Sequence, residues 1–340
     1  MKNTKKYISI LVSLSITVVL FLYLFNASDI EKIKQTMLGV KPWHLLLYAL
    51  FSLSNVFFRS FRYKLLLEPV KIPWVTIFGV TLVRNLFVDM FPAKLGAFSY
   101  IALLKERYKV AMNACLVSFF YSFLFDIVTL PPFLMFSMMT VTFDQQMPSP
   151  VFMVGGAMII ILFSLLIIIF LDKIIKMGNH LLLWAGNKFT LKNKRHFIVL
   201  AGKADELQNA VMNLRKSGIM IKVFFISLLV RFFKYLGLYC LFASVYAGAR
   251  GLFNLEHFGQ LIFGITAADI TPLLPFQAFG GYGTWETAWS IVLMLFGYPK
   301  SDAAVVGLTI HAYSQIWEYF IGFIAFCVII VPFVIKKRKK

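Results

Sequence analysis

The chain has few of the features that build soluble enzymes, metal centres or multi-domain proteins. Its three cysteines, Cys115, Cys240 and Cys327, lie far apart in apolar segments, with no C-x-x-C pair and no histidine at ligand spacing. We expect these cysteines to be packing residues, and we expect neither a metal nor a cofactor. No Gly/Ser-rich linker or low-complexity tract divides the 340 residues, which predicts a single domain over 1–340.

Acidic residues are also scarce, with 15 Asp and Glu against 34 Lys and Arg, for a formal net charge of +19. Such a charge is common in nucleic-acid-binding proteins. Here, however, the basic residues lie at the ends of apolar segments, and no aromatic-basic motif accompanies them. We therefore expect no nucleic-acid partner, and we interpret the charge as a determinant of membrane topology.

Apolar residues are abundant, at 60% of the chain, and the mean hydropathy is +0.79. A helix needs about 20 residues to cross a bilayer. Six apolar runs reach this length, near 7–26, 43–66, 111–140, 151–172, 218–243 and 302–334. The sequence predicts an all-α, polytopic membrane helix bundle with six full spans, the first of them retained and not cleaved as a signal peptide.

Two further apolar segments, near 73–105 and 257–297, are too long for one crossing and too interrupted for one straight helix. The second contains T-P-L-L-P-F-Q-A-F-G-G-Y-G-T-W-E at 271–286, with two prolines and three glycines. Non-helical backbone at membrane depth must be covered by protein or water, because unpaired peptide groups are costly in hydrocarbon. We therefore expect two re-entrant hairpins, or pairs of short tilted helices, for about eight membrane segments in all.

The positive charges predict the orientation of these segments. If the N-terminus is cytoplasmic and both interrupted segments return to the side they enter, 22 Lys and Arg lie in cytoplasmic segments and five in outer ones. This bias indicates that both termini are cytoplasmic. The hairpins then enter from opposite sides, as in the inverted repeats of many transporters.

The longest hydrophilic stretch, 173–217, has nine Lys and Arg against two acidic residues. It is expected to form cytoplasmic helices that lie on anionic lipid headgroups. We expect the membrane to be the plasma membrane of a prokaryote.

Ionisable residues inside apolar segments are the main evidence for a site, because each costs about 3 kcal/mol at the bilayer centre unless it is paired or solvated. Arg59 and Arg62 are three residues apart on one helical face, and so are Arg231 and Lys234. Each pair is suited to bind phosphate oxygens. Snorkelling to the interface is an equally good explanation for Arg62, whereas a buried role is favoured for Arg231.

The first interrupted segment has a second group of candidates. They are Arg84, Asn85, Asp89, Pro92, Lys94 and Gly96. A helix that starts after Pro92 would direct free N–H groups and a positive dipole end inward, which is an anion-binding arrangement. The alternative is an ordinary interfacial turn in which Arg84 pairs with Asp89.

In the second interrupted segment, Gly280, Gly281 and Gly283 permit positive φ and close backbone approach. Glu286 is expected to pair with a deep arginine or to bind a coupling cation. The remaining acids, Asp126, Asp269 and Glu318, are candidate counter-ions or members of a proton path, with structural pairing of Asp126 and Glu318 to Arg231 and Arg84 as the simpler role.

His311 lies in the last apolar run and is able to titrate near neutral pH. A single histidine in a helix is more often a hydrogen-bonded packing residue, and that is the role expected for His311.

Three segments resemble the membrane domain of the lysylphosphatidylglycerol synthetase/flippase family. They are R-S-F-R-Y-K-L-L-L at 59–67, N-L-F-V-D-M-F-P-A-K-L-G at 85–96 and P-F-Q-A-F-G-G-Y-G-T-W-E at 275–286. The resemblance implies a lipid-translocating domain with two opposed re-entrant elements. It also implies that family positions are held here by Arg59, Arg62, Asn85, Pro92, Lys94, Gly96 and Glu286.

The chain departs from this family at Ala97 and Tyr100, where relatives often have a glutamate followed by an arginine. The departure bears on the substrate more than on the fold. Bifunctional relatives carry an aminoacyl-transferase domain after the membrane region; this chain shows none, so we expect no transfer of lysine from tRNA.

The leading hypothesis is a flippase-like transporter, and not an enzyme, that moves an anionic or lipid-linked substrate between leaflets. Aminoacyl phospholipids and polyisoprenyl-phosphate sugars both satisfy this description. One alternative is an intramembrane enzyme acting on lipid phosphates or glycans, although no D-D-x-x-D motif, histidine pair or activated Ser or Cys is present. Another is a non-transporting partner of an envelope glycosyltransferase. The identity of the lipid and the oligomeric state are left open.

Overall fold

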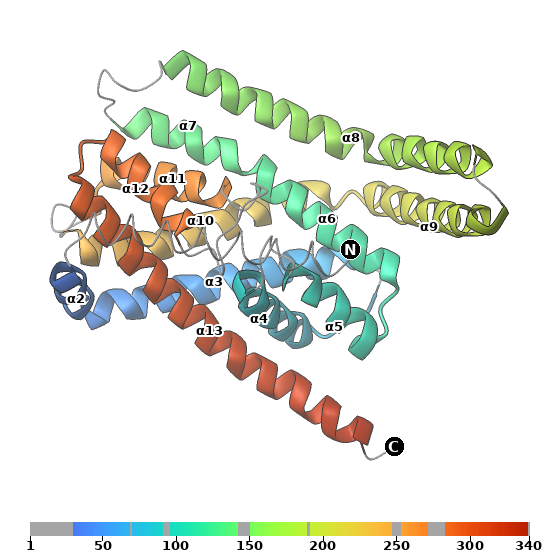
Figure 1. The fold of residues 1–340 in the computed structure, drawn as a ribbon, viewed down its shortest axis with the longest axis horizontal. Coiled ribbons are helices and arrows are strands. Elements are labelled where there is room, and N and C mark those ends of the chain that lie inside the picture. Colours follow the sequence, from blue (N-terminus) through green and yellow to red (C-terminus); the bar gives the residue numbers. More distant parts are fainter. Residues whose placement is uncertain are drawn as a thin grey trace.

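The computed structural model describes residues 30–68, 70–90, 96–141, 150–188, 191–246, 253–270 and 283–338 (Figure 1). These residues are helical, with short connections and no strand, which confirms the predicted all-α class. The helices are α2 (Ile30–Leu38), α3 (Pro42–Leu66), α4 (Trp74–Met90), α5 (Phe98–Tyr108), α6 (Met112–Val128), α7 (Leu130–Thr140), α8 (Pro150–Lys188), α9 (Leu191–Lys216), α10 (Met220–Val245), α11 (Leu255–Ile270), α12 (Thr284–Leu295) and α13 (Lys300–Arg338). The predicted first span, 7–26, lies outside the described residues.

Long apolar helices are present at the positions of several predicted spans. Among the described residues, three segments are long and apolar enough to cross a membrane: Met112–Thr140, Met220–Val245 and Lys300–Ile330. The first of these is two consecutive helices, α6 and α7, that meet at Thr129. The chain changes helix there because Pro131 and Pro132, at the start of α7, lack the N–H groups that would continue the hydrogen bonds of α6. The structure is that of a multi-pass membrane protein.

The centre of the bundle is formed by α3 and α10, which lie side by side along most of their lengths (Figure 1). Asn55 of α3 ties the two helices together by donating its side-chain N–H to the carbonyl of Val230, at 2.6 Å. An apolar helix surface offers little preference for one neighbour in lipid, so such polar bonds and close packing are what select the partner.

Helix α13 crosses the bundle and contacts both interrupted segments (Figure 1). Its first half packs against α12, where Val306 and Ile310 share an apolar cluster with Trp289 and Leu293. Its second half packs against α4, where Ala325 and Ile329 join a separate cluster. The two interrupted segments therefore rest on the two ends of one helix.

Each interrupted segment contains two described helices that are separated by residues outside the described part of the chain. In the first, α5 packs back against α4, and Gly96 lies so close to the last turn of α4 that a Cβ atom there would be 1.6 Å from the carbonyl oxygen of Phe87. A glycine is therefore required for the chain to return. In the second, α11 and α12 also lie against each other. The breaks themselves, 91–95 and 271–282, lie outside the described residues.

The basic stretch 173–217 is helical, and its position on anionic headgroups stays a prediction. Helix α8 continues from its apolar part to Lys188 without interruption, and α9 packs back along it as a long hairpin (Figure 1). No proline lies in 151–188 to stop the helix. Asn179 and Asp205 join the two helices by a side-chain hydrogen bond of 2.5 Å.

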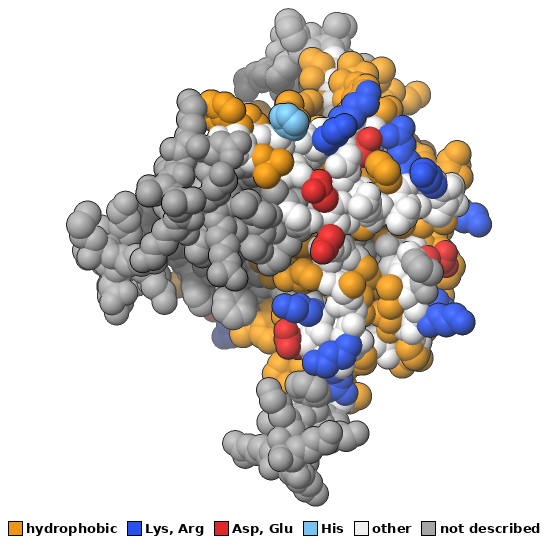
Figure 2. All heavy atoms as spheres, turned by 90° about the vertical axis from the view of Figure 1, so that its right-hand side faces the viewer, with side chains coloured by type: hydrophobic (Ala, Val, Ile, Leu, Met, Phe, Trp, Pro, Cys, Tyr) orange, Lys and Arg blue, Asp and Glu red, His pale blue; other side chains and the backbone are white. Residues whose placement is uncertain are grey.

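Exposed cations gather at the end of the molecule from which this hairpin projects, as Figure 2 shows. They include Lys71, Lys105, Lys109, Lys176, Arg215 and Lys216. The clustering agrees with the charge bias from which the topology was predicted.

Candidate functional site

The polar centre of the bundle is built by helical periodicity. Ser122, Asp126 and Thr129 follow one another at intervals of four and three residues on α6 and its end, and Ser227, Arg231 and Tyr235 do so at intervals of four on α10. Residues with this spacing lie on one face of a helix. The two polar faces meet around Arg62 of α3.

Arg62 is fully buried, and both of its terminal nitrogens have protein acceptors, whereas its Nε has none among the described residues. One terminal nitrogen donates to Asp126 Oδ1 at 2.7 Å and to Ser227 Oγ at 3.0 Å, and the other donates to Ser122 Oγ at 2.6 Å. A charge buried in this way persists because it is paired and hydrogen-bonded. Arg62 therefore holds α3, α6 and α10 together and does not snorkel to the interface.

Arg231 is the second buried cation of this centre. It donates to the backbone carbonyl of Asp126, to Tyr235 Oη at 3.0 Å and to Thr129 Oγ1 at 3.4 Å. Its guanidinium is also 4.0 Å from Asp269 at the end of α11. The expectation of a buried role for Arg231 is confirmed, but its carboxylate neighbour is Asp269, whereas the Asp126 carboxylate belongs to Arg62.

Lys234 completes a chain of alternating charges. Its ammonium group donates to both oxygens of Asp269, at 2.7 and 2.6 Å. This chain of contacts connects α3 to α11, and both of its acids face a cation. Its members are Arg62, Asp126, Arg231, Asp269 and Lys234. Asp126 and Asp269, which the sequence named as candidate counter-ions or members of a proton path, each contact a cation in the structure.

Arg59 and Arg84 differ from Arg62 and Arg231 because they have no carboxylate partner among the described residues. Both are half-buried, and the Nε atom of each is buried without a hydrogen-bond partner among the described residues. Arg84 donates a terminal N–H to the Asn85 side chain at 3.1 Å. The charges of Arg84, Arg62 and Asp126 all act on Arg59, so the two arginines belong to one electrostatic group. A buried cationic donor that lacks an acceptor is costly, which makes these two side chains the candidates for binding an anion.

Several predicted residues of the first interrupted segment are not placed by the structure. Pro92 and Lys94 lie outside the described residues, as does the side chain of Asp89. The anion-binding helix start after Pro92 and the Arg84–Asp89 pair therefore remain predictions. Gly96 is described, and its role is the close return of the chain onto α4.

In the second interrupted segment, Gly280 and Gly281 also lie outside the described residues, but Gly283 and Glu286 are described. Gly283 has φ of +92° and begins α12, and its N–H donates to Glu286 Oε2 at 2.7 Å. Glu286 is fully buried, and its other oxygen lies 2.5 Å from His311 Nδ1. The described partner of Glu286 is thus a histidine and not a deep arginine, and the alternative of a coupling cation stays a prediction.

His311 was expected to be a packing residue, and sequence reasoning underestimated it. Its Nε2 lies 3.1 Å from the Gln315 amide nitrogen, and Trp285 stacks on its ring with centroids 4.7 Å apart. The sequence did contain a signal, since Gln315 is four residues after His311 and lies on the same helical face. Glu318, half-buried further along α13, is not assigned a role by the described contacts.

The serines and threonines around the arginines were also missed by the sequence analysis. Their spacing of three or four residues from Asp126 and Arg231 would have identified them.

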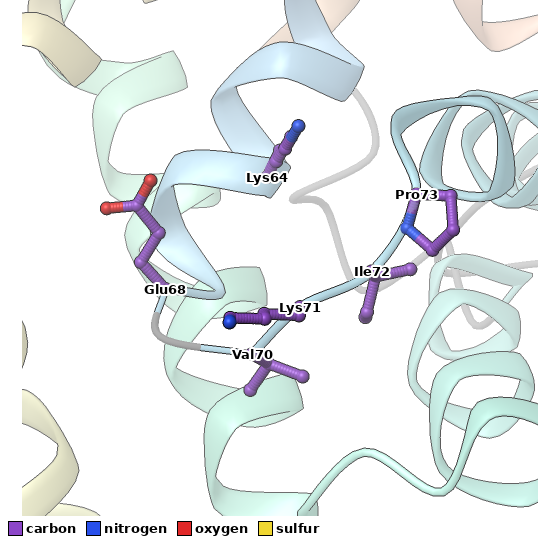
Figure 3. A pocket seen from close by; sticks show the side chains of 6 residues that line it. All are labelled: Lys64, Glu68, Val70, Lys71, Ile72 and Pro73. Atoms are coloured by element: carbon purple, nitrogen blue, oxygen red, sulfur yellow. The ribbon is translucent and has the colours of Figure 1, made fainter.

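A separate, open hollow of about 390 Å³ lies at the end of α3. Figure 3 shows Lys64 on the last turn of α3, with Glu68 and Lys71 in the residues that follow. Two lysines and one glutamate in such an open position suit a loosely held headgroup better than a buried substrate.

The described residues contain no cluster of three or more His, Cys, Asp or Glu that could hold a metal ion. Comparison with known proteins returns neither a curated protein nor a solved structure that matches. The family model described as the lysylphosphatidylglycerol synthase TM region matches residues 10–322, which is most of the chain. This match agrees with the three motifs and with the helical membrane bundle, and we conclude that the chain belongs to the lysylphosphatidylglycerol synthase transmembrane-region family.

Proposed function

We propose that the protein is a flippase-like transporter that moves a lipid with an anionic headgroup between the leaflets of a prokaryotic plasma membrane. The single observation that carries the proposal is the pair Arg59 and Arg84, which have buried Nε groups without an acceptor and, unlike Arg62 and Arg231, no carboxylate partner among the described residues. Membership of a family named for a lipid-modifying membrane protein supports a lipid as the ligand. The substrate class is an aminoacyl phospholipid or a polyisoprenyl-phosphate lipid.

The charges of the site favour a phosphate as the group that is bound. Arg62 is held by Asp126, and Lys234 and Arg231 are held by Asp269, so these cations position the helices. Arg59 and Arg84 retain donors for phosphate oxygens, which guanidinium groups bind in bidentate geometry. Arg59 on α3 and Arg84 on α4 would grip the phosphate, while Asn85 and Lys94 contribute further donors.

Alternating access follows from the position of the two interrupted segments on α13. In our proposal these segments are opposed re-entrant hairpins, with both chain termini in the cytoplasm. Rocking of one hairpin-containing half against the other, with α13 as the shared support, would open the arginine pair to each leaflet in turn.

The test is lipid movement in proteoliposomes that contain a fluorescent phospholipid, an aminoacyl phospholipid or a polyisoprenyl phosphate. Arg59→Gln and Arg84→Gln should each slow movement by about tenfold or more, because a hydrogen bond to a charged group contributes about 1.5–3 kcal/mol. Arg215→Gln is the matched control, since Arg215 is an exposed arginine bound to the carbonyl of Ile169.

Equal movement with and without protein, for every lipid in the panel, would refute transport. Unchanged movement in Arg84→Gln would refute the assigned site. Turnover of a labelled lipid phosphate in place of movement would favour an intramembrane enzyme, and a glycosyltransferase that co-purifies with an inactive transporter would favour the scaffolding alternative.

A further inference from the structure

The buried pair Glu286 and His311 is the strongest feature that anion binding does not use. Glu286 is fully buried and the His311 side chain is 5% exposed, and 2.5 Å separates the carboxylate oxygen from Nδ1. The pair lies where α12 begins, next to the break of the second interrupted segment. Two titratable groups that share one hydrogen bond in a buried position form a proton-binding unit.

Gln315 provides for both protonation states of this unit. With its amide nitrogen 3.1 Å from His311 Nε2, it donates to a neutral imidazole whose Nδ1–H points at Glu286. The Gln315 Oε1 atom is buried and has no hydrogen-bond partner among the described residues. Rotation of the amide by half a turn would place this oxygen against Nε2, where it accepts an N–H from the imidazolium. A proton that binds to the Nε2 lone pair is therefore accommodated without a change of fold.

Aromatic rings cover the imidazole of the pair. Trp285 stacks on the imidazole and Trp289 stacks in turn on Trp285, with ring centroids 5.5 Å apart. The titratable groups on the described parts of α2, α4, α10, α11 and α13, which pack against α12 or α13, are Glu31, Lys32, Lys34, Arg84, Lys222, Arg231, Lys234, Tyr235, Tyr239, Cys240, Glu256, His257, Asp269, Lys300, Asp302, Tyr313, Glu318, Tyr319 and Cys327. Of the carboxylates, Asp269 is bound by Lys234, and Asp302 is bound by Lys32 of α2.

The same carboxylate connects the proton to the backbone. Glu286 Oε2 accepts the N–H of Gly283, and the Gly283 carbonyl accepts the N–H of Thr287 in the first turn of α12. Hydrogen bonds to a charged carboxylate are about twice as strong as those to a neutral group. The carboxylate stays charged when the proton binds to His311 Nε2, so the proton acts by drawing the carboxylate charge toward the imidazolium, which weakens the bond to the Gly283 N–H.

We propose that Glu286 and His311 bind the coupling proton, so that uptake of a proton from water and its release on the other side drive lipid movement. This inference rests on the proposed transport function. The proton forms an N–H bond with the Nε2 lone pair and leaves from the same nitrogen, so no other bond is made or broken. Gln315 is a positioning residue that accepts the added N–H.

The first experiment measures proton binding without lipid transport. Ring-¹⁵N-labelled histidine in the full chain is followed by NMR in nanodiscs between about pH 5 and 8. The resonance that disappears in His311→Gln should titrate, and Glu286→Gln and Gln315→Leu should each shift its protonation to lower pH, because they remove the groups that stabilise the imidazolium. A His311 resonance that remains in one protonation state overturns the proposal, and an unchanged midpoint in both variants does so as well.

The second experiment measures coupling. Proteoliposomes are given a pH difference of about one unit, with the membrane potential clamped, and the steady-state ratio of lipid between leaflets is measured. One proton per lipid changes this ratio by about tenfold. The wild type should show the change, and His311→Gln should not. His180→Gln, at an exposed position on α8, and Glu106→Gln, at an exposed position on α5, are matched controls that should behave as the wild type.

The outcomes separate the two proposals. Lipid movement that ignores the pH difference in the wild type overturns coupling and leaves transport in place. Absence of any protein-dependent movement overturns transport, and coupling with it. Loss of the pH response in His180→Gln as well as in His311→Gln would show that the response does not arise from the pair.

Discussion

The ion pair between Arg62 and Asp126 is the contact whose loss should be easiest to measure. Asp126→Asn keeps the shape of the side chain and an acceptor oxygen, but removes the negative charge that faces a guanidinium with no exposed surface. Breaking a buried pair on one side typically costs about 3–5 kcal/mol. Asp126 is itself 31% exposed, and Arg62 keeps its bonds to Ser122 and Ser227, so we expect a smaller cost, about 2–3 kcal/mol.

Thermal unfolding of the purified protein, followed by tryptophan fluorescence, provides the assay. At roughly 2–4 °C per kcal/mol for larger domains, the unfolding midpoint of Asp126→Asn should fall by about 4–12 °C. Asp172→Asn is the matched control, because its partner Arg215 is 3.4 Å away and half exposed, and such a pair contributes about 1 kcal/mol or less.

A double-mutant cycle with Arg62→Gln then isolates the pair. Because Arg62→Gln already removes the unpaired charge, adding Asp126→Asn to it should cost less than Asp126→Asn costs alone, with a coupling of about 1–3 kcal/mol. Strict additivity of the two changes, or a midpoint of Asp126→Asn equal to that of Asp172→Asn, would refute the assignment of this pair as a structural clamp.

Three further predictions concern folding. Gly96→Ala should abolish accumulation of folded protein in the membrane, because its Cβ would clash with the last turn of α4, whereas Gly202→Ala, with no atom within 4 Å, should accumulate normally; normal levels of both would contradict the close return. Ser122→Ala should lower stability by about 1–2 kcal/mol through its lost bond to Arg62, measured by the same thermal assay, and an unchanged midpoint would show that this bond is dispensable. Gly283→Ala should lower the free energy of unfolding by about 1–2 kcal/mol, because alanine is strained at the positive φ of this position. A variant as stable as the wild type would show that the backbone there imposes no such strain.

The general fold was predictable because length and hydropathy constrain a membrane protein strongly. Helix α10 matches the predicted span 218–243 closely, and each interrupted segment contains two described helices in place of one long one. The α8–α9 hairpin was not predictable from charge alone. Basic residues predict the side of the membrane, but the direction of a helix after it leaves the bilayer depends on whether anything stops it.

The candidate site was predictable in its members and not in its pairings. Every cation and acid of the central chain was identified from its depth in an apolar run, because such residues are costly in lipid. Which acid meets which cation depends on the rotation and register of four helices. Asp126 and Asp269 both lay within reach of Arg231 in principle, and side-chain spacing along one helix does not choose between partners on another.

Glu286 is a second residue whose partner could not be predicted from the sequence. Its burial and importance followed from the sequence, but its partner lies 25 residues away on α13 and is a neutral or cationic histidine depending on one proton. A single histidine carries no pattern of its own. Only the contact with Glu286 and Gln315 distinguishes it from a packing residue.

The support that α13 gives to both interrupted segments has a consequence for biogenesis. Helix α13 follows residues 74–108 and 255–295 in the chain, so the ribosome completes both segments before the surface that covers them exists. During that interval their backbone breaks and ionisable side chains must be shielded by the insertion machinery or remain outside the bilayer. Insertion of α13 would then be the step that allows both segments to settle, and substitutions along it would impair membrane assembly before they affect any transport cycle.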